Sequence, residues 1–227
     1  MVGIIIQARM GSTRMPGKTM TLIQGKPLLF YCFSRASLSK YAEKVIIATT
    51  IEPSDDVIEK WCHENGVLCF RGSENDVLDR YYNAASLFGL DVIVRLTADN
   101  PFVDPKIVDM LITSLFCFDK EYVTMRLKTN TWPYGLDAEV FTYKALKENW
   151  EKSHELYHRE HVTTYIKDNP TQFRILEIPL DQSLAHIRLT VDYPKDFSDA
   201  SYLLKILLSR FGLSFSWNDV LSIVQPN

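Results

Sequence analysis

Residues 2–18 of the chain read VGIIIQARMGSTRMPGK, an apolar β-branched run that leads directly into a basic loop. The run Val2–Ile6 is too short for a core helix and predicts a buried strand. In open α/β sheets, ligands bind at the carboxyl ends of the strands, where the opening loop Gln7–Lys18 would lie. This stretch therefore predicts an α/β protein with a binding site at its first turn.

The same alternation continues along the chain and favours a sheet covered by helices. Short apolar, β-branched runs predict further strands at Lys44–Thr49, Val67–Phe70, Asp91–Leu96, Tyr122–Met125, Leu136–Phe141, Phe173–Ile178 and Ile187–Val191. Helical spacing predicts helices over Pro27–Leu38, Ser54–Asn65, Glu74–Phe88, Pro105–Phe118, Tyr143 to about Lys167, Pro194–Arg210 and Trp217–Val224. Strands that alternate with helices imply right-handed crossovers and a mainly parallel sheet. We expect one Rossmann-like α/β domain over residues 1–227, with a mixed β/α excursion at about 122–190.

Composition limits the functions open to this chain. With a formal net charge of -3 it lacks the basic excess of a general nucleic-acid binder, so any phosphate-binding surface must be local. Its four cysteines form no CxxC pair, which disfavours a zinc knuckle or a disulfide framework. No apolar run approaches the length of a membrane helix, and we expect a cytoplasmic protein without a membrane or nucleic-acid partner.

The residues of the opening loop suit a polyphosphate. Gly11 and Ser12 let backbone N–H groups approach phosphate oxygens closely. Arg9, Arg14 and Lys18 bring three cations into the same loop, and arginine can grip a phosphate in a fork. The spacing matches neither GxGxxG nor the P-loop, so an exposed basic turn stays an alternative.

Two aspartates that follow predicted strands are candidates for metal binding. Asp99 comes shortly after Asp91–Leu96, and Asp192 comes directly after Ile187–Val191. Mg²⁺ binds one or two carboxylates together with phosphates and water, so two aspartates converging from distant parts of the chain would complete a triphosphate site. Helix capping would explain either residue separately.

Over nearly its whole length the sequence resembles a known family. The pattern Ala8-Arg9-x-Gly11-Ser12-x-Arg14-x-Pro16-x-Lys18 is similar to the signature loop of the cytidylyltransferases that make CMP-linked acidic sugars. These include the CMP-Kdo and CMP-sialate synthetases and, with the strongest resemblance, the SpsF-like branch associated with spore-coat polysaccharide synthesis. The similarity continues in order through Arg71-Gly72-Ser73-x-x-Asp76-Val77-Leu78-x-Arg80-Tyr81, Arg95-Leu96-Thr97-Ala98-Asp99-x-Pro101, Arg159-Glu160-His161 and Leu189-Thr190-Val191-Asp192-x-Pro194-x-Asp196.

This resemblance implies a GT-A-type fold and the transfer of CMP from CTP to a sugar, with release of pyrophosphate, in polysaccharide or surface-glycan biosynthesis. It implies that Asp99 and Asp192 hold a catalytic Mg²⁺, and we expect Arg9 and Lys18 to act with them as catalytic residues on the phosphates. The predicted nucleotide-binding residues are Ala8, Arg9, Gly11, Ser12, Arg14, Lys18, Arg71, Ser73 and Ala98. Among these Arg71 and Ser73 would contact cytosine, although a βα loop with a serine helix cap explains the same segment equally well.

The second half of the chain is expected to bind the acceptor. The predicted acceptor-binding residues are Arg126, Tyr134, Asp137, Glu139, Arg159 and His161. An acidic sugar needs a cation near its carboxylate, which Arg126 or Arg159 would provide. The chain lacks recognisable forms of the acceptor signatures of the Kdo and sialate enzymes, and Tyr193 stands where relatives often have a small polar residue. The identity of the sugar is therefore left open.

Other functions remain possible at this level. The chain could be a nucleotidyltransferase for another base, a glycosyltransferase on the same fold, or a non-catalytic nucleotide-binding subunit. Retention of Arg9, Lys18, Asp99 and Asp192 disfavours the non-catalytic alternative.

Two more patterns in the second half bear on partners. His154, His158 and His161 have the i, i+4, i+7 spacing of one helix face, which we interpret as a polar face because the HExxH pattern of zinc proteases is absent. The family resemblance implies pairing through the second half of the chain, and the turn-rich Lys128–Gly135, with the exposed-looking Trp132, Pro133 and Tyr134, is the expected homodimer contact. Both interpretations depend on where these side chains lie in the fold.

Overall fold

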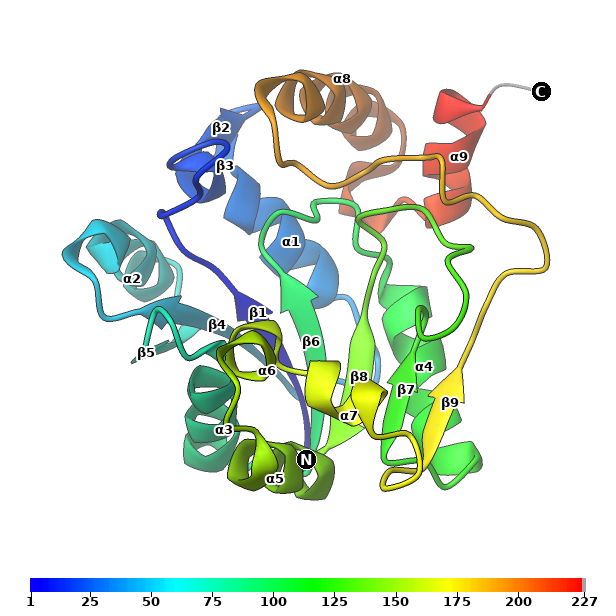
Figure 1. The fold of residues 1–227 in the computed structure, drawn as a ribbon. Helices are drawn as coiled ribbons and strands as arrows, with labels where there is room; N and C mark the ends of the chain where they lie inside the picture. The colour runs from blue at the N-terminus through cyan, green and yellow to red at the C-terminus, as the bar shows by residue number, and fades with distance from the viewer. Residues whose placement is uncertain (226–227) are drawn as a thin grey trace.

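A computed structural model describes residues 1–225 and confirms an α/β fold built on a mostly parallel sheet (Figure 1). In the described part, seven strands pair in the order β5-β4-β1-β6-β8-β7-β9. They are β1 (Val2–Gln7), β4 (Lys44–Thr50), β5 (Leu68–Gly72), β6 (Val92–Thr97), β7 (Tyr122–Thr124), β8 (Glu139–Thr142) and β9 (Ile175–Glu177). Among these seven strands, only β8 runs antiparallel to its neighbours, which are β6 and β7. The carboxyl ends of β1, β4, β5 and β6 therefore meet at one edge.

Helices cover both faces of the sheet because successive strand residues point to opposite sides. In β1, Ile4 and Ile6 join one core, and Ile5 joins the other. The first core contains α1 (Leu28–Ala36), α2 (Asp56–Glu64), α4 (Pro105–Cys117), α8 (Pro194–Phe211) and α9 (Trp217–Val224). The second contains α3 (Val77–Phe88), α5 (Tyr143–Lys152) and α7 (Thr164–Asp168). Figure 1 shows α7 in front of the sheet, with α1 and α4 behind it.

Side-chain caps set where several helices begin. The Asp104 carboxylate accepts a hydrogen bond from the Lys106 N–H, and Pro105 takes the first helical position of α4. The Asp76 carboxylate accepts from the Asp79 N–H, so α3 begins at Val77 and not at Glu74. The segment before α2 is a short 3-10 turn, Pro53–Asp55.

The predicted strand Ile187–Val191 was wrong. The segment is extended and its side chains alternate between buried and more exposed, but it makes only one isolated bridge, Tyr134 to Arg188, among the described residues. Its backbone pairs with loops instead: Leu189 N–H donates to Tyr134 O, and Val191 N–H donates to Asp99 O. The segment therefore joins the second half of the chain to the end of β6.

Other boundaries also differ from the prediction. The helical stretch from Tyr143 to Lys167 is broken into α5, α6 (Leu156–His161) and α7, with Val162 at a φ of 58° between the last two. Strand β8 begins at Glu139, not Leu136. The sequence prediction missed the hairpin β2 (Leu22–Ile23) and β3 (Lys26–Pro27), and the 3-10 turns Lys18–Met20 and Gly212–Ser214.

Two expectations about the surface can be compared with the structure. Trp132 and Pro133 are buried, contrary to the expected exposed contact, and the Trp132 indole N–H donates to Ile178 O. Tyr134 is 42% exposed. No helix within residues 1–225 combines the length and apolar character needed to cross a membrane.

Candidate active site

The opening loop leaves the end of β1 and is held in place by a buried carboxylate. Asp55 accepts a hydrogen bond from the Met10 N–H at 2.7 Å and further ones from the hydroxyls of Thr49 and Thr50. Gly17 has a φ of 75°, which glycine adopts without strain and which turns the chain into the 3-10 segment that begins at Lys18. The loop is therefore fixed against the ends of β1 and β4.

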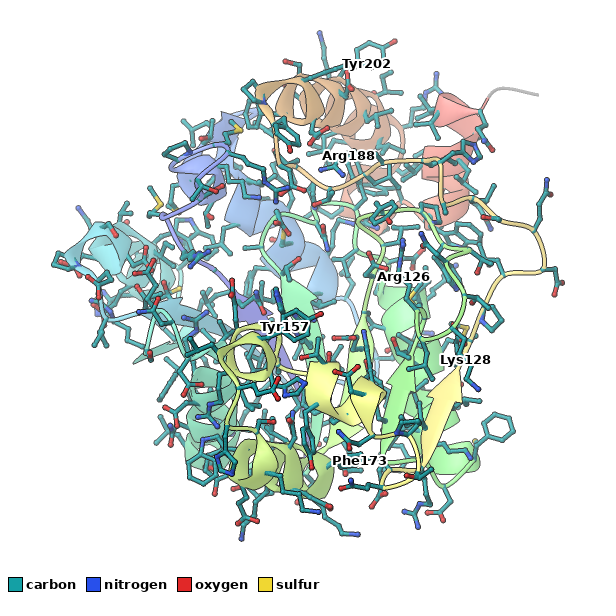
Figure 2. The ribbon with its side chains drawn as sticks, in the orientation of Figure 1. Arg126, Lys128, Tyr157, Phe173, Arg188 and Tyr202 are labelled. Atoms are coloured by element: carbon teal, nitrogen blue, oxygen red, sulfur yellow. The ribbon has the colours of Figure 1, made fainter. Side chains whose placement is uncertain are left out.

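Two adjoining cavities open at the carboxyl edge of the sheet. The first, about 320 Å³ and here called the loop cavity, is lined by the opening loop and the ends of β1 and β6. The second, about 350 Å³ and here called the second-half cavity, is lined by β6, the Thr124–Glu139 segment, Lys167 and Asp192. They share the four residues Arg14, Arg95, Thr97 and Asp99. Figure 2 labels Arg126 on the loop that follows β7, Tyr157 on α6 and Arg188 on the segment that leads into α8.

The ammonium group of Lys18 joins both predicted metal carboxylates. Its Nζ lies 2.9 Å from Asp99 Oδ2 and 3.1 Å from Asp192 Oδ1, and it also donates to Val191 O at 2.7 Å. Lys18 is buried, with 8% of its surface exposed. Two carboxylates that come from distant parts of the chain thus converge on a single point beside the opening loop.

Asp192 is surrounded by positive charge. Arg14 lies 2.7 Å from its Oδ1, and Arg188 lies 2.5 Å from its Oδ2. Burial alone would raise the pKa of Asp192, but the hydrogen bonds from Lys18 and Arg188 and the charge of Arg14 outweigh burial and lower the pKa below its usual value. The carboxylate is therefore ionised at neutral pH, as a metal ligand must be.

The donor set fits a magnesium ion that also binds phosphates. Within residues 1–225, no three His, Cys, Asp or Glu side chains gather closely enough to hold a metal by themselves. Asp99 and Asp192 supply two carboxylates, which is the usual protein share of a Mg²⁺ site completed by substrate phosphates and water. The three histidines that might have suggested zinc do not share a helix, because His154 lies in the break between α5 and α6.

The structure brings most of the predicted nucleotide-binding residues together. The loop cavity is lined by Ala8, Arg9, Ser12, Arg14, Lys18, Ala98 and Asp99. Gly11 is in the same loop, but it is not among the residues that line the cavity in the described part of the chain. The cationic side of the predicted site is therefore assembled as a unit.

Arg71 and Ser73 are placed differently. Arg71 Nη1 lies 2.7 Å from both Asp56 and Glu59, and its Nε donates to Thr50 O, so this side chain fastens β5 to α2. The Ser73 hydroxyl accepts from the Asp76 N–H at 3.0 Å. Neither residue is among those that line the loop cavity in the described structure.

The predicted acceptor residues separate into two groups. Arg126, Tyr134, Asp137 and Glu139 line the second-half cavity, whereas His161 lines the loop cavity. Arg126 forms an ion pair with Asp137 and stacks 4.2 Å over the ring of Tyr134. Arg159 lies elsewhere: its Nε donates to Asp76 Oδ2 at 2.8 Å, which ties α6 to the start of α3.

Several lining residues were missed by the sequence-based prediction. Arg95 lines both cavities, Gln7 and Arg80 line the loop cavity, and Lys167 lines the second-half cavity. Arg95 Nη1 and Lys167 Nζ each lie 2.6 Å from an oxygen of the buried Glu139 carboxylate. The available signal for Arg95 was a charged residue inside the apolar strand Val92–Thr97.

Comparison with known proteins identifies the family to which this site belongs. A family model described as cytidylyltransferase matches residues 3–211. The chain belongs to the cytidylyltransferase family. The enzyme is therefore a nucleotidyltransferase that uses CTP, as the opening-loop pattern predicted.

Individual relatives agree with this assignment. The cytidylyltransferase is 37% identical over 206 residues to the spore coat polysaccharide biosynthesis protein SpsF of Bacillus subtilis, covering 88% of this chain and 84% of that protein. A solved cytidylyltransferase structure from Leptospira borgpetersenii serovar Hardjo-bovis has a TM-score of 0.89 at 36% identity and covers 99% of this chain and 93% of that one. The structure of CMP:2-keto-3-deoxy-manno-octonic acid synthetase complexed with CTP has a TM-score of 0.71 at 16% identity, with coverages of 90% and 98%, and shows that the fold is shared.

Proposed function

We propose that this cytidylyltransferase binds CTP in the loop cavity and transfers CMP to an acidic sugar in the second-half cavity, with release of pyrophosphate. The observation that carries the proposal is the cluster of Lys18, Asp99 and Asp192 where the two cavities adjoin. In such an arrangement the acceptor hydroxyl attacks the α-phosphorus in line, and the pyrophosphate leaves on the side of the opening loop.

The opening loop supplies the charge that this reaction requires. Arg9, Arg14 and Lys18 line the loop cavity and are assigned to the triphosphate. Preorganised cations stabilise the negative charge that develops on the transferring and leaving oxygens. Arg95, which lines both cavities, adds a fourth cation at their junction.

Asp99 and Asp192 would hold a Mg²⁺ ion, which supplies neutralisation of phosphate charge when it is bound. The side chains themselves orient the site. The Thr97 hydroxyl donates to Asp99 Oδ1 at 2.6 Å, and Arg14 and Arg188 hold Asp192 from two directions. No side chain is assigned as a general base, because positioning of the acceptor can supply much of the rate.

The second-half cavity supports an acidic acceptor. Arg126 and Lys167 both line it, and each is paired with a single carboxylate partner, Asp137 and Glu139 respectively. Arg126 and Arg159 are the two cations predicted to meet the sugar carboxylate. Of these, Arg126 lines this cavity, and Lys167 is a second cation in its lining. The name of the Bacillus subtilis relative, a spore coat polysaccharide biosynthesis protein, agrees with a role in glycan synthesis.

Pyrophosphate release tests this function. CTP, UTP, GTP and ATP are each incubated with the enzyme, Mg²⁺ and a panel of acidic and neutral sugars. We expect release with CTP and acidic sugars. Pyrophosphate release that occurs with neutral sugars but not with acidic sugars would overturn the proposal. Equal release from all four triphosphates would also overturn it.

Self-association stays a separate proposal for the second half of the chain. With Trp132 and Pro133 buried, the exposed ring of Tyr134 is the part of the expected contact that can face a second copy. Light scattering on purified protein would show a dimer mass if this proposal holds and a monomer mass if it fails. Residence in the cytoplasm is likewise still a prediction.

A further inference from the structure

Unpartnered polar atoms point to a recognition site inside the loop cavity. Within residues 1–225, the buried side-chain atoms without a hydrogen-bond partner are Gln7 Oε1, Arg80 Nε, Arg95 Nε, Asn100 Oδ1 and Thr164 Oγ1. Buried polar atoms in proteins are nearly always paired, so each exception calls for a partner that binds there. Gln7 and Arg80 line the loop cavity only, Arg95 lines both cavities, Asn100 lines only the second-half cavity, and Thr164 lines neither.

The Gln7 and Arg80 side chains both line the loop cavity, on the side of the sheet that α3 covers. Gln7 points to the same side as Ile5, which belongs to the α3 core. The single O–H of Tyr81 lies between two backbone acceptors, Ile5 O and Leu96 O, each 3.2 Å away, and so fixes α3 against β1 and β6. Arg80 lies one residue before Tyr81 and lines the cavity from the helix.

Arg80 is held rigidly even though one of its donors is free. Only 2% of its surface is exposed, and its Nη1 donates to Ser73 O at 2.7 Å. A Cβ added at Gly72 would lie 3.1 Å from Arg80 Cγ, so the arginine stem packs directly on the β5 backbone. The Nε–H therefore has a fixed place beside the cavity.

An unpaired acceptor and an unpaired donor in one cavity match the edge of cytosine. The 4-amino group of cytosine donates, and its N3 and O2 accept. Uracil reverses this pattern, with O4 accepting and N3–H donating. Adenine shares the cytosine pattern, but the family uses CTP.

We infer that Gln7 and Arg80 read the base: Gln7 Oε1 accepts from the 4-amino group, and Arg80 Nε donates to N3 or O2. The inference rests on CTP binding in the loop cavity and assigns base selection to this pair in place of Arg71 and Ser73. The Arg71 guanidinium pairs with Asp56 and Glu59 of α2 and donates to Thr50 O and Glu52 O, and the Ser73 hydroxyl accepts from the N–H of Asp76, the residue that caps α3. Neither residue is among those that line the loop cavity in the described structure.

Calorimetric titration with two nucleotides tests the role of Gln7 without any acceptor sugar. The nucleotides are CTP and the triphosphate of pyrimidin-2-one ribonucleoside, which lacks the 4-amino group. The wild type should bind CTP about tenfold more tightly, because the analogue leaves a buried acceptor unpaired. In Gln7→Leu the two affinities should become equal. Retention of the wild-type preference in Gln7→Leu would overturn the inference, whereas failure of the wild type to bind CTP would overturn the proposed function itself.

A conservative variant tests the role of Arg80 while keeping the fold. Arg80→Lys keeps the charge and most of the buried stem but removes Nε. It should weaken CTP and the analogue equally, by about tenfold, and keep the preference between them. Wild-type affinity in Arg80→Lys would overturn the role of Arg80. Thr164→Val is the matched control, since it removes a buried unpartnered hydroxyl outside both cavities and should change neither affinity.

Discussion

Lys18 and Asp192 stand 174 positions apart in the sequence, yet Lys18 Nζ lies 3.1 Å from Asp192 Oδ1. The same ammonium group reaches Asp99 at the end of β6. The last residue of the opening loop therefore joins the two carboxylates that are assigned to the metal. The cations assigned to the phosphates and the carboxylates assigned to the metal form one continuous site. A substitution at Lys18 should therefore affect both the phosphate-binding and the metal-binding parts of it.

Lys18→Met tests this connection. The variant keeps an apolar stem of similar length but leaves Asp99 and Asp192 facing each other without the shared cation. We expect kcat/KM for CTP to fall about 100-fold or more, the usual effect of losing one transition-state donor. Lys60→Met, which removes an exposed lysine paired only with Glu64, is the control and should keep wild-type activity. A Lys18→Met enzyme with wild-type kcat/KM would show that the contact has no catalytic role.

Much of this arrangement was predictable because it depends on local pattern. Short β-branched runs gave the parallel strands that place Gln7 and Thr97 side by side, since β1 and β6 pair in register. The opening loop follows β1 directly, so its position at the sheet edge follows from connectivity. The cationic half of the site could therefore be assigned from sequence.

The remaining parts depend on partners that no local pattern specifies. The alternation in Ile187–Val191 correctly indicated an extended chain, but its backbone pairs with Tyr134 and Asp99 instead of joining the sheet. Arg71 has the composition of a base-binding residue, yet α2 places Asp56 and Glu59 beside it. In the same way, the fold places Asp76 beside Arg159 and the two form an ion pair. Which carboxylate a cation meets is decided by tertiary packing, which the spacing of residues does not encode.

Glu139→Gln tests the buried ion cluster between β6 and α7. Burial alone would raise the pKa of Glu139, but the charges of Arg95 and Lys167 outweigh burial and hold the pKa well below its usual value. The folded state therefore gains stability from the ionised carboxylate at pH values above about 4.5, and loses it as the pH falls toward the folded pKa. We expect the variant to be about 3 kcal/mol less stable than the wild type at pH 7, the cost of breaking a buried pair.

The pH dependence gives this prediction a second readout. Urea unfolding at pH 7 and at pH 3 should show a smaller difference between wild type and Glu139→Gln at pH 3. Glu64→Gln, at an exposed pair, should lie within about 0.5 kcal/mol of the wild type at both pH values. A difference that stays constant with pH would mean that the Glu139 charge does not stabilise the fold.

Gly135→Ala tests how the second-half cavity is built. Gly135 has a φ of 97°, and an added Cβ would lie 2.4 Å from the backbone nitrogen of Thr190. Because the segment that contains Thr190 carries Asp192, the substitution should both destabilise the protein, by about 3 kcal/mol, and lower turnover. Gly66→Ala is the control: its φ is 65° and nothing lies within 4 Å of the added atom, so it should cost only about 1 kcal/mol and leave turnover unchanged. If Gly135→Ala and Gly66→Ala lowered the free energy of unfolding in urea by the same amount, the close approach of Gly135 to Thr190 would be contradicted.

Pyrophosphate release from CTP by Asp99→Asn is the measurement that tests the central claim most directly. The substitution preserves volume and removes the charge that faces Lys18, while Asp181→Asn, at an exposed position outside both cavities, is the matched control. With Mg²⁺ and an acidic-sugar panel, we predict release by the wild type and by Asp181→Asn, and release at least about 100-fold slower by Asp99→Asn, with unchanged circular dichroism. Wild-type release by Asp99→Asn would contradict the assignment of this carboxylate to the metal and to the reaction.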